Sequence, residues 1–135
     1  QQCAVIRQMV ADLNMPLRLI FDETVREESG LAMSSRNQYF TPEQKSEAAE
    51  LFRSLTKAAR TLSTLNPDSN DALRRTLDET TDSLRSKGFG VEYLDAVDPK
   101  TMHPATHIEQ DSRLVVAAKF HTVRLIDNIP VFDKP

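Results

Sequence analysis

Residues 113–131 read RLVVAAKFHTVRLIDNIPV and contain two apolar, β-rich runs around a short polar turn. The runs cover 113–119 and 123–131, and the turn falls near Phe120 and His121. Two such runs separated by so few residues predict a β-hairpin. Histidine tolerates a positive backbone φ better than most residues, which suits a place in the turn.

A third β-rich run lies upstream, at 91–97, and Asp98-Pro99 ends it. Residues 99–112 show no periodicity and are predicted to be loop. Together with the hairpin, this run predicts about three antiparallel strands. Asp127 and Asn128 interrupt the last apolar run, so a structural hydrogen-bonding role is expected for them rather than catalysis.

The middle of the chain has the periodicity of two helices. The first is predicted from Thr41 to about residue 64, because a capping threonine, a proline and Gln44 stand at its start. Asn66-Pro67 breaks it, and the second helix ends at Lys87-Gly88. The two helices are expected to form an antiparallel pair. Their apolar positions are Ala48, Leu51, Phe52, Leu55, Ala59 and Leu62 in the first helix, and Leu73, Leu77 and Leu84 in the second.

The N-terminal part has a different pattern. An apolar stripe predicts a helix that stops at Asn14 and Pro16. Alternation then predicts a short strand over 17–21, followed by a charged connector over 22–30. Helix then strand suggests the last αβ unit of a parallel-sheet domain. Because the chain starts without methionine and enters a helical pattern at once, it is expected to be a piece of a longer protein.

Composition narrows the function classes. The 135 residues are 39% hydrophobic and 27% charged, which is typical of one globular domain. The net charge of −3 gives no electrostatic footprint for nucleic acid, and runs such as 114–118 are too short to span a membrane. A single cysteine, Cys3, excludes an intrachain disulfide and favours a reducing, cytoplasmic compartment. His103 and His107 lack further ligands, so no metal site is expected.

Loop 30–37, GLAMSSRN, holds the residue types that bind phosphate. Gly30 permits a backbone conformation closed to other residues, and Ser34 and Ser35 offer hydroxyl groups beside turn amides. Arg36 supplies a planar, permanently charged fork that matches phosphate oxygens. The alternative is an ordinary polar turn with an exposed arginine, since the loop matches no Walker or Rossmann fingerprint.

The order of these pieces resembles the pantothenate synthetase (pantoate–β-alanine ligase) family. The resemblance rests on Arg26-Glu27 followed by GLAMSSRN at 30–37, then an aromatic pair and a helix. It continues through QQCAVIRQMVADLN at 1–14 and LVVAAKFHTVRLIDNIPV at 114–131. The Met-Ser-Ser-Arg-Asn block is that family's version of a flexible signature loop shared with class I aminoacyl-tRNA synthetases.

The resemblance implies a ligase that joins pantoate to β-alanine with ATP and Mg²⁺ through a pantoyl-adenylate intermediate. It implies that Met33, Ser34, Ser35 and Arg36 close over ATP, with Ser34, Ser35 and Arg36 acting on the phosphates during catalysis. The backbone at Val25 is expected to contact adenine, and Gln2 is expected to bind pantoate. No general base is needed, because a carboxylate is already a nucleophile.

The chain also departs from the family pattern. The family's paired-histidine signature, its Gly-Glu-Lys-Asp segment and a second pantoate-binding glutamine are not in this chain, and His121 stands where relatives usually have glycine. The chain is therefore expected to be the C-terminal half of the enzyme, inactive without the N-terminal half. The intact enzyme is expected to be a homodimer that forms through the other half.

The resemblance also divides this α+β chain. Residues 1–29 are expected to end a Rossmann-like nucleotidyltransferase domain, 30–37 to be the ATP-phosphate loop, and 38–135 to be a C-terminal lid domain. A non-catalytic helical interaction module is the rival interpretation, and another adenylate-forming ligase of the same superfamily is a third. An interaction module gives no reason for the signature loop.

Overall fold

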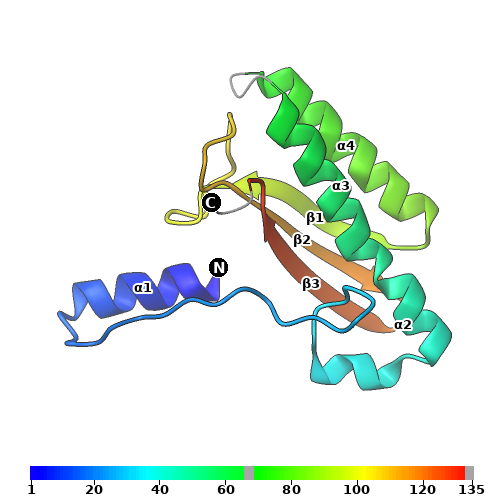
Figure 1. Ribbon diagram of the computed structural model, residues 1–135, viewed down its shortest axis with the longest axis horizontal. Coiled ribbons are helices and arrows are strands. Elements are labelled where there is room, and N and C mark those ends of the chain that lie inside the picture. Colours follow the sequence, from blue (N-terminus) through cyan, green and yellow to red (C-terminus); the bar gives the residue numbers. More distant parts are fainter. Residues whose placement is uncertain (66–68, 133–135) are drawn as a thin grey trace.

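The computed structural model describes residues 1–65 and 69–132. Its centre is an antiparallel sheet in the order β1-β2-β3, formed by β1 (Gly90–Val97), β2 (Arg113–Phe120) and β3 (Val123–Pro130) (Figure 1). The predicted three strands and the hairpin are thus confirmed. His121 lies in the turn between β2 and β3 with a φ of 50°, the conformation that histidine was expected to tolerate.

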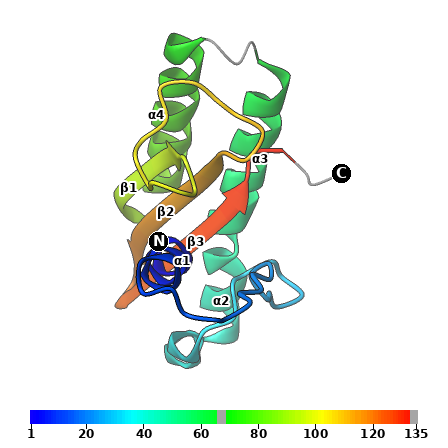
Figure 2. The same cartoon turned by 90° about the vertical axis from the view of Figure 1, so that its left-hand side faces the viewer.

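Helices α3 (Glu50–Thr64) and α4 (Asn70–Ser86) cover one face of the sheet (Figure 1, Figure 2). Helix α4 packs on β1 and α3 packs on β3, and the two helices also pack on each other as the predicted pair. The core between these layers is apolar. Its largest side chains with almost no exposed surface are Leu51, Leu55, Leu84, Leu114 and Val116.

The helix start at Thr41 is confirmed, but the single long helix predicted after it is wrong. The Thr41 hydroxyl accepts from the Gln44 amide while the Gln44 side chain accepts from the Thr41 amide, which is a complete capping box. Helix α2 (Pro42–Ala48) then ends, and α3 begins at Glu50, with Ala49 between the two helices. The carbonyl of Ser46 accepts from the Arg53 guanidinium, so a side chain satisfies a backbone group at the break.

The predicted break at Asn66-Pro67 lies outside the described residues, while the end of the second helix is confirmed. The Ser69 hydroxyl caps the start of α4 by accepting from the Ala72 amide. Beyond its end, Gly88 has a φ of +88°, the left-handed conformation that favours glycine after a helix.

The N-terminal helix is confirmed as α1 (Gln2–Asp12), but the strand predicted over 17–21 is wrong. That segment is irregular, and Leu17 and Ile20 are 57% and 73% exposed. A strand exists only when a neighbour pairs with its backbone. In the described chain, the strands of the sheet pair with one another and not with 17–21.

Among the described residues, no helix combines the length and the apolar character needed to cross a bilayer.

Candidate functional site

A tight backbone turn forms the base of the signature loop. The Met33 amide donates to the Val25 carbonyl, and the Glu27 amide donates to the Leu31 carbonyl, each at 2.9 Å. Gly30 sits at the tip of this turn with a φ of +92°, and its amide donates to the Glu27 carbonyl. The expectation that Gly30 is needed for its backbone freedom is therefore confirmed.

The middle of the loop is open to solvent between two buried anchors. Met33, Ser34, Ser35 and Arg36 are all exposed, whereas Leu31 before them and Asn37 after them are only 3% and 2% exposed. The Ser34 hydroxyl accepts from the Arg36 amide and caps a short 3₁₀ helix, η1 (Ser35–Tyr39). Within the described part of the chain, the Arg36 guanidinium forms no ion pair. Its charge is thus free for a ligand.

Asn37 anchors the C-terminal end of the loop. Its Nδ2 donates to Glu27 Oε1 at 2.9 Å and to the Ala32 carbonyl at 3.0 Å. These two acceptors fix the orientation of the amide, because a flipped side chain would turn its oxygen toward two other oxygens. The Asn37 Oδ1 atom is then buried without a partner among the described residues. A buried polar atom without a partner carries a free-energy cost.

The N-terminal end of the loop is tied to the sheet by Arg26. Its guanidinium donates to both carboxylate oxygens of Asp127 on β3, at 2.7 and 2.9 Å, and lies 3.9 Å from the centre of the Phe52 ring on α3. The predicted structural hydrogen-bonding role of Asp127 is confirmed. Its partner was missed, because Arg26 is 101 residues away in the chain. A carboxylate inside an apolar strand was the only signal in the sequence that pointed to a charged partner.

The other predicted site residues lie in two places. Val25 is 68% exposed and is joined to Met33 through the backbone hydrogen bond described above. Gln2 is exposed in the first turn of α1, and no hydrogen bond in the described part of the chain links its side chain to the loop. Figure 1 shows α1 extending away from the helix-covered sheet. The structure thus brings Val25 to the loop but leaves Gln2 apart from it.

The described residues do not form a metal cage. No group of three or more His, Cys, Asp or Glu side chains in the ranges 1–65 and 69–132 is placed to hold a metal ion. His107 instead makes an exposed contact with Glu109 at 3.0 Å. The described residues therefore offer no three-ligand protein cage for Mg²⁺, a metal that commonly binds through one or two carboxylates and substrate phosphates.

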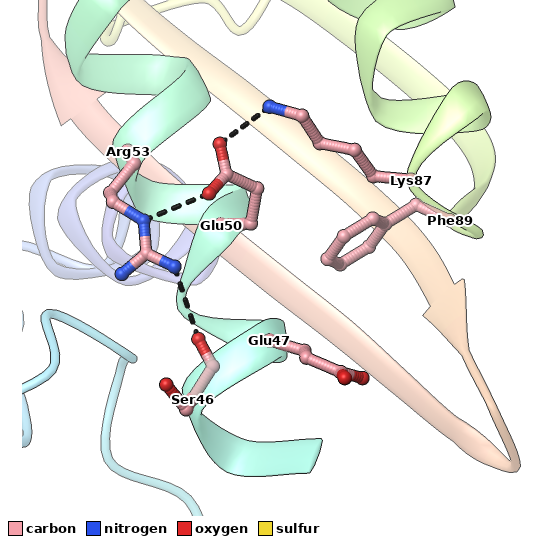
Figure 3. A pocket seen from close by; sticks show the side chains of 6 residues that line it. All are labelled: Ser46, Glu47, Glu50, Arg53, Lys87 and Phe89. Atoms are coloured by element: carbon pink, nitrogen blue, oxygen red, sulfur yellow. Dashed lines mark hydrogen bonds and ion pairs between the residues drawn. The ribbon is translucent and has the colours of Figure 1, made fainter. Parts of the chain in front are cut away.

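A surface hollow of about 280 Å³ lies where α2 and α3 approach the end of α4 (Figure 3). Glu50 lies between two cations there: it accepts from Lys87 Nζ at 2.6 Å and from Arg53 Nε at 2.9 Å. The hydrogen bond from Lys87 is the main cause that lowers the pKa of Glu50. Because these charges satisfy one another, the hollow is a structural ion-pair network and not the candidate site.

We expect this network to make the stability of the fold depend on pH. The folded-state pKa of Glu50 is lowered, so its contribution is complete above the unfolded value near 4.5 and is lost as the pH falls through the folded pKa. Replacing Glu50 by Gln should lower the free energy of unfolding near pH 7 by about 0.2–1 kcal/mol, as for other surface pairs. Urea unfolding from pH 7 to pH 3 measures this difference, which should shrink below pH 4.5.

Glu79→Gln on the exposed face of α4 is the matched control and should show no such dependence. A Glu50→Gln deficit that stays constant down to pH 3 would contradict the assignment.

The fold and the loop together define an α+β domain that presents an exposed Ser-Ser-Arg segment suited to an anionic ligand. The chain belongs to the pantoate–β-alanine ligase family, since the sequence model described as Pantoate-beta-alanine ligase matches residues 1–130. Pantothenate synthetase from Acinetobacter baumannii is 42% identical over 135 residues, which are 100% of this chain and 46% of that protein. A bifunctional pantoate ligase/cytidylate kinase from Trichodesmium erythraeum is 42% identical over 130 residues, 96% of this chain and 24% of that protein.

Solved structures agree with this assignment. Pantothenate synthetase from Thermus thermophilus superposes with a TM-score of 0.85 at 35% identity, over 98% of this chain and 46% of that one. Pantoate-beta-alanine ligase from Francisella tularensis, complexed with Beta-gamma ATP and Beta-alanine, superposes with a TM-score of 0.62 at 25% identity, over 96% of this chain and 40% of that one. The chain spans about half the length, or less, of the curated relatives that it matches.

Proposed function

We propose that this chain is the part of a cytoplasmic pantoate–β-alanine ligase that carries the loop contacting the ATP phosphates. One observation supports this most: an exposed Met33–Arg36 segment, whose arginine forms no ion pair among the described residues, is held between buried anchors at Leu31 and Asn37. Buried anchors at both ends hold the loop in place, while its exposed side chains can donate to a ligand. This arrangement suits a loop that must bind a charged ligand in one geometry. The Francisella relative was solved in complex with Beta-gamma ATP and Beta-alanine, which supports the same ligand class here.

The proposed reaction has two steps. The carboxylate of pantoate attacks the α-phosphorus of ATP, pyrophosphate leaves, and pantoyl adenylate forms. The amine of β-alanine then attacks the acyl carbon, and AMP leaves. In the first step negative charge moves onto the departing pyrophosphate, where the Arg36 guanidinium and the hydroxyls of Ser34 and Ser35 stabilise it. Met33 closes over ATP together with these three residues.

The remaining ligand contacts extend this proposal. The backbone at Val25, beside the base of the loop, contacts adenine, and Gln2 hydrogen-bonds pantoate through its amide. Mg²⁺ is a counter-ion of the ATP phosphates and neutralises part of their charge. Every role assigned to this chain is binding, orientation or charge stabilisation, and none is routed through the metal.

The proposal also assigns a separate role to each part of the enzyme. Residues 1–29 end a Rossmann-like domain, 30–37 form the phosphate clamp, and 38–135 form a lid that closes over the nucleotide. The surfaces for adenine, ribose and most of pantoate then belong to the other half of the enzyme. The 135 residues alone are therefore inactive, and the intact enzyme is a homodimer.

Pantoate-dependent ATP–pyrophosphate exchange tests this division. The assay is run on the 135-residue chain, on the chain mixed with the N-terminal half of the enzyme, and on the full-length protein. We expect no exchange by the chain alone, restored exchange in the mixture, and full exchange by the full-length protein. Robust exchange by the chain alone would show that the adenylation site lies within it and would refute the division.

A further inference from the structure

Arg26 contacts both a carboxylate and an aromatic ring. Its two terminal nitrogens donate to Asp127 Oδ2 and Oδ1 in a bidentate pair, and its guanidinium stacks on the Phe52 ring. The Arg26 side chain is 17% exposed and that of Asp127 only 3%. A bidentate pair of this kind restricts orientation as well as distance, which a single charge contact does not do.

The same side chain holds the loop. Arg26 Nη1 also donates to the Gly30 carbonyl at 3.1 Å, and the Arg26 backbone pairs with Ala32 across the turn. The first residues of the signature loop are therefore connected through one guanidinium to both α3 and β3. Movement of the sheet relative to the loop would break this connection.

Asp127 is itself held rigidly. Its Oδ1 accepts from the Asn128 amide at 2.7 Å, and its backbone lies in β3 opposite Val116. The carboxylate thus has a fixed place on the helix-covered side of the sheet. A fixed acceptor at one end and the Gly30 carbonyl at the other leave the guanidinium a single arrangement.

We propose that Arg26 and Asp127 are positioning residues for the nucleotide step: their pair sets the direction in which Ser34, Ser35 and Arg36 face the phosphates. This inference rests on the proposed function for its ligand. Neither residue touches ATP; both act through the backbone of the loop. Phe52 supports the pair by covering the face of the guanidinium.

Asp127→Asn and Arg26→Lys in the full-length protein test the proposal. Asparagine keeps the size of the side chain but removes the charge, and lysine keeps the charge but loses the fork and the stack. Amide hydrogen exchange at Glu27 and Met33 reports on the turn, because their amides close it. We expect these amides to exchange about 10- to 100-fold faster in both variants, while the core amides of β2 are unchanged. The KM for ATP in pyrophosphate exchange should rise by about tenfold or more.

Glu92→Gln is the matched control, because it breaks a comparable arginine–carboxylate pair. Arg124, three residues before Asp127 on β3, pairs with Glu92 of β1 at 2.8 Å, and both side chains are exposed, at 49% and 39%. This variant should leave both the amide exchange of the turn and the KM for ATP as in the wild type. Equal effects in all three variants would overturn the proposal.

Other outcomes separate the two claims. Unchanged turn amides in both test variants, or core amides that accelerate as much as the turn, would overturn the positioning role. If the wild type shows normal pyrophosphate exchange and both test variants keep its KM for ATP, the positioning role alone would be overturned. A full-length wild type without pantoate-dependent exchange would overturn the proposed function, and the positioning role for ATP with it.

Discussion

Replacing Arg36 with Ala in the full-length protein should lower kcat/KM for pantoate-dependent ATP–pyrophosphate exchange by about 100- to 1000-fold, the usual effect of removing one preorganised charge-stabilising donor. The stability of the fold should not change, because the Arg36 side chain is exposed and forms no ion pair among the described residues. Steady-state exchange kinetics and urea unfolding of the same preparation measure the two quantities.

Arg60→Ala is the matched control for this variant. Arg60 is also exposed, on α3, but lies outside the loop, and its removal should leave exchange unchanged. Arg36→Lys should recover only part of the activity, because an ammonium cannot contact two phosphate oxygens through a planar fork. An Arg36→Ala protein with wild-type kinetics would contradict the role given to the loop. It would favour the interaction-module interpretation, in which Arg36 has no function.

Gly30→Ala should cost both stability and activity. A β-carbon at Gly30 would lie 2.5 Å from Phe52 Cδ1, and the φ of +92° is one that alanine rarely adopts. The backbone strain alone is about 1–3 kcal/mol. Relief of the clash moves the Phe52 ring on which Arg26 stacks, so the loop should lose its fixed base. We expect exchange activity to fall by about tenfold or more, as for other misplacements of a binding group.

Gly88→Ala separates strain from the clash. Gly88 has nearly the same φ, +88°, but an added β-carbon would meet only Phe120 Cε2 at 3.9 Å, an ordinary contact. This variant should lose stability, seen in urea unfolding, but keep wild-type exchange kinetics. If Gly88→Ala lost as much exchange activity as Gly30→Ala, global destabilisation would explain both. The specific role of the Gly30 turn would then be rejected.

The main elements could be predicted because local patterns determine them. The two β-rich runs on either side of His121 predicted the hairpin, and the capping box at Thr41 predicted a helix start to the residue. The break at Ala49 could not be predicted in the same way. The helical pattern continues through it, and the Arg53 side chain that satisfies the Ser46 carbonyl is recognised only in three dimensions.

At 17–21 the local pattern predicted an element that the structure does not contain. Its alternation is typical of a strand, but a strand also needs a partner, and the described chain provides none for it. The site shows a similar division. The residue types of loop 30–37 predicted a charge-binding segment, whereas the connection of Arg26 to Asp127 depends on residues 101 positions apart. Only the fold brings such residues together.

The central claim is that the exposed segment Met33–Arg36 closes over the phosphates of ATP. Amide hydrogen exchange of these four residues in the full-length protein, with and without saturating ATP, Mg²⁺ and pantoate, tests it most directly. The claim predicts that the amides of these exposed residues exchange about tenfold or more slowly when ATP is bound, while the core amides of β2 stay as they were. Unchanged exchange at Met33–Arg36 in a protein that is saturated with ATP and catalytically active would contradict it.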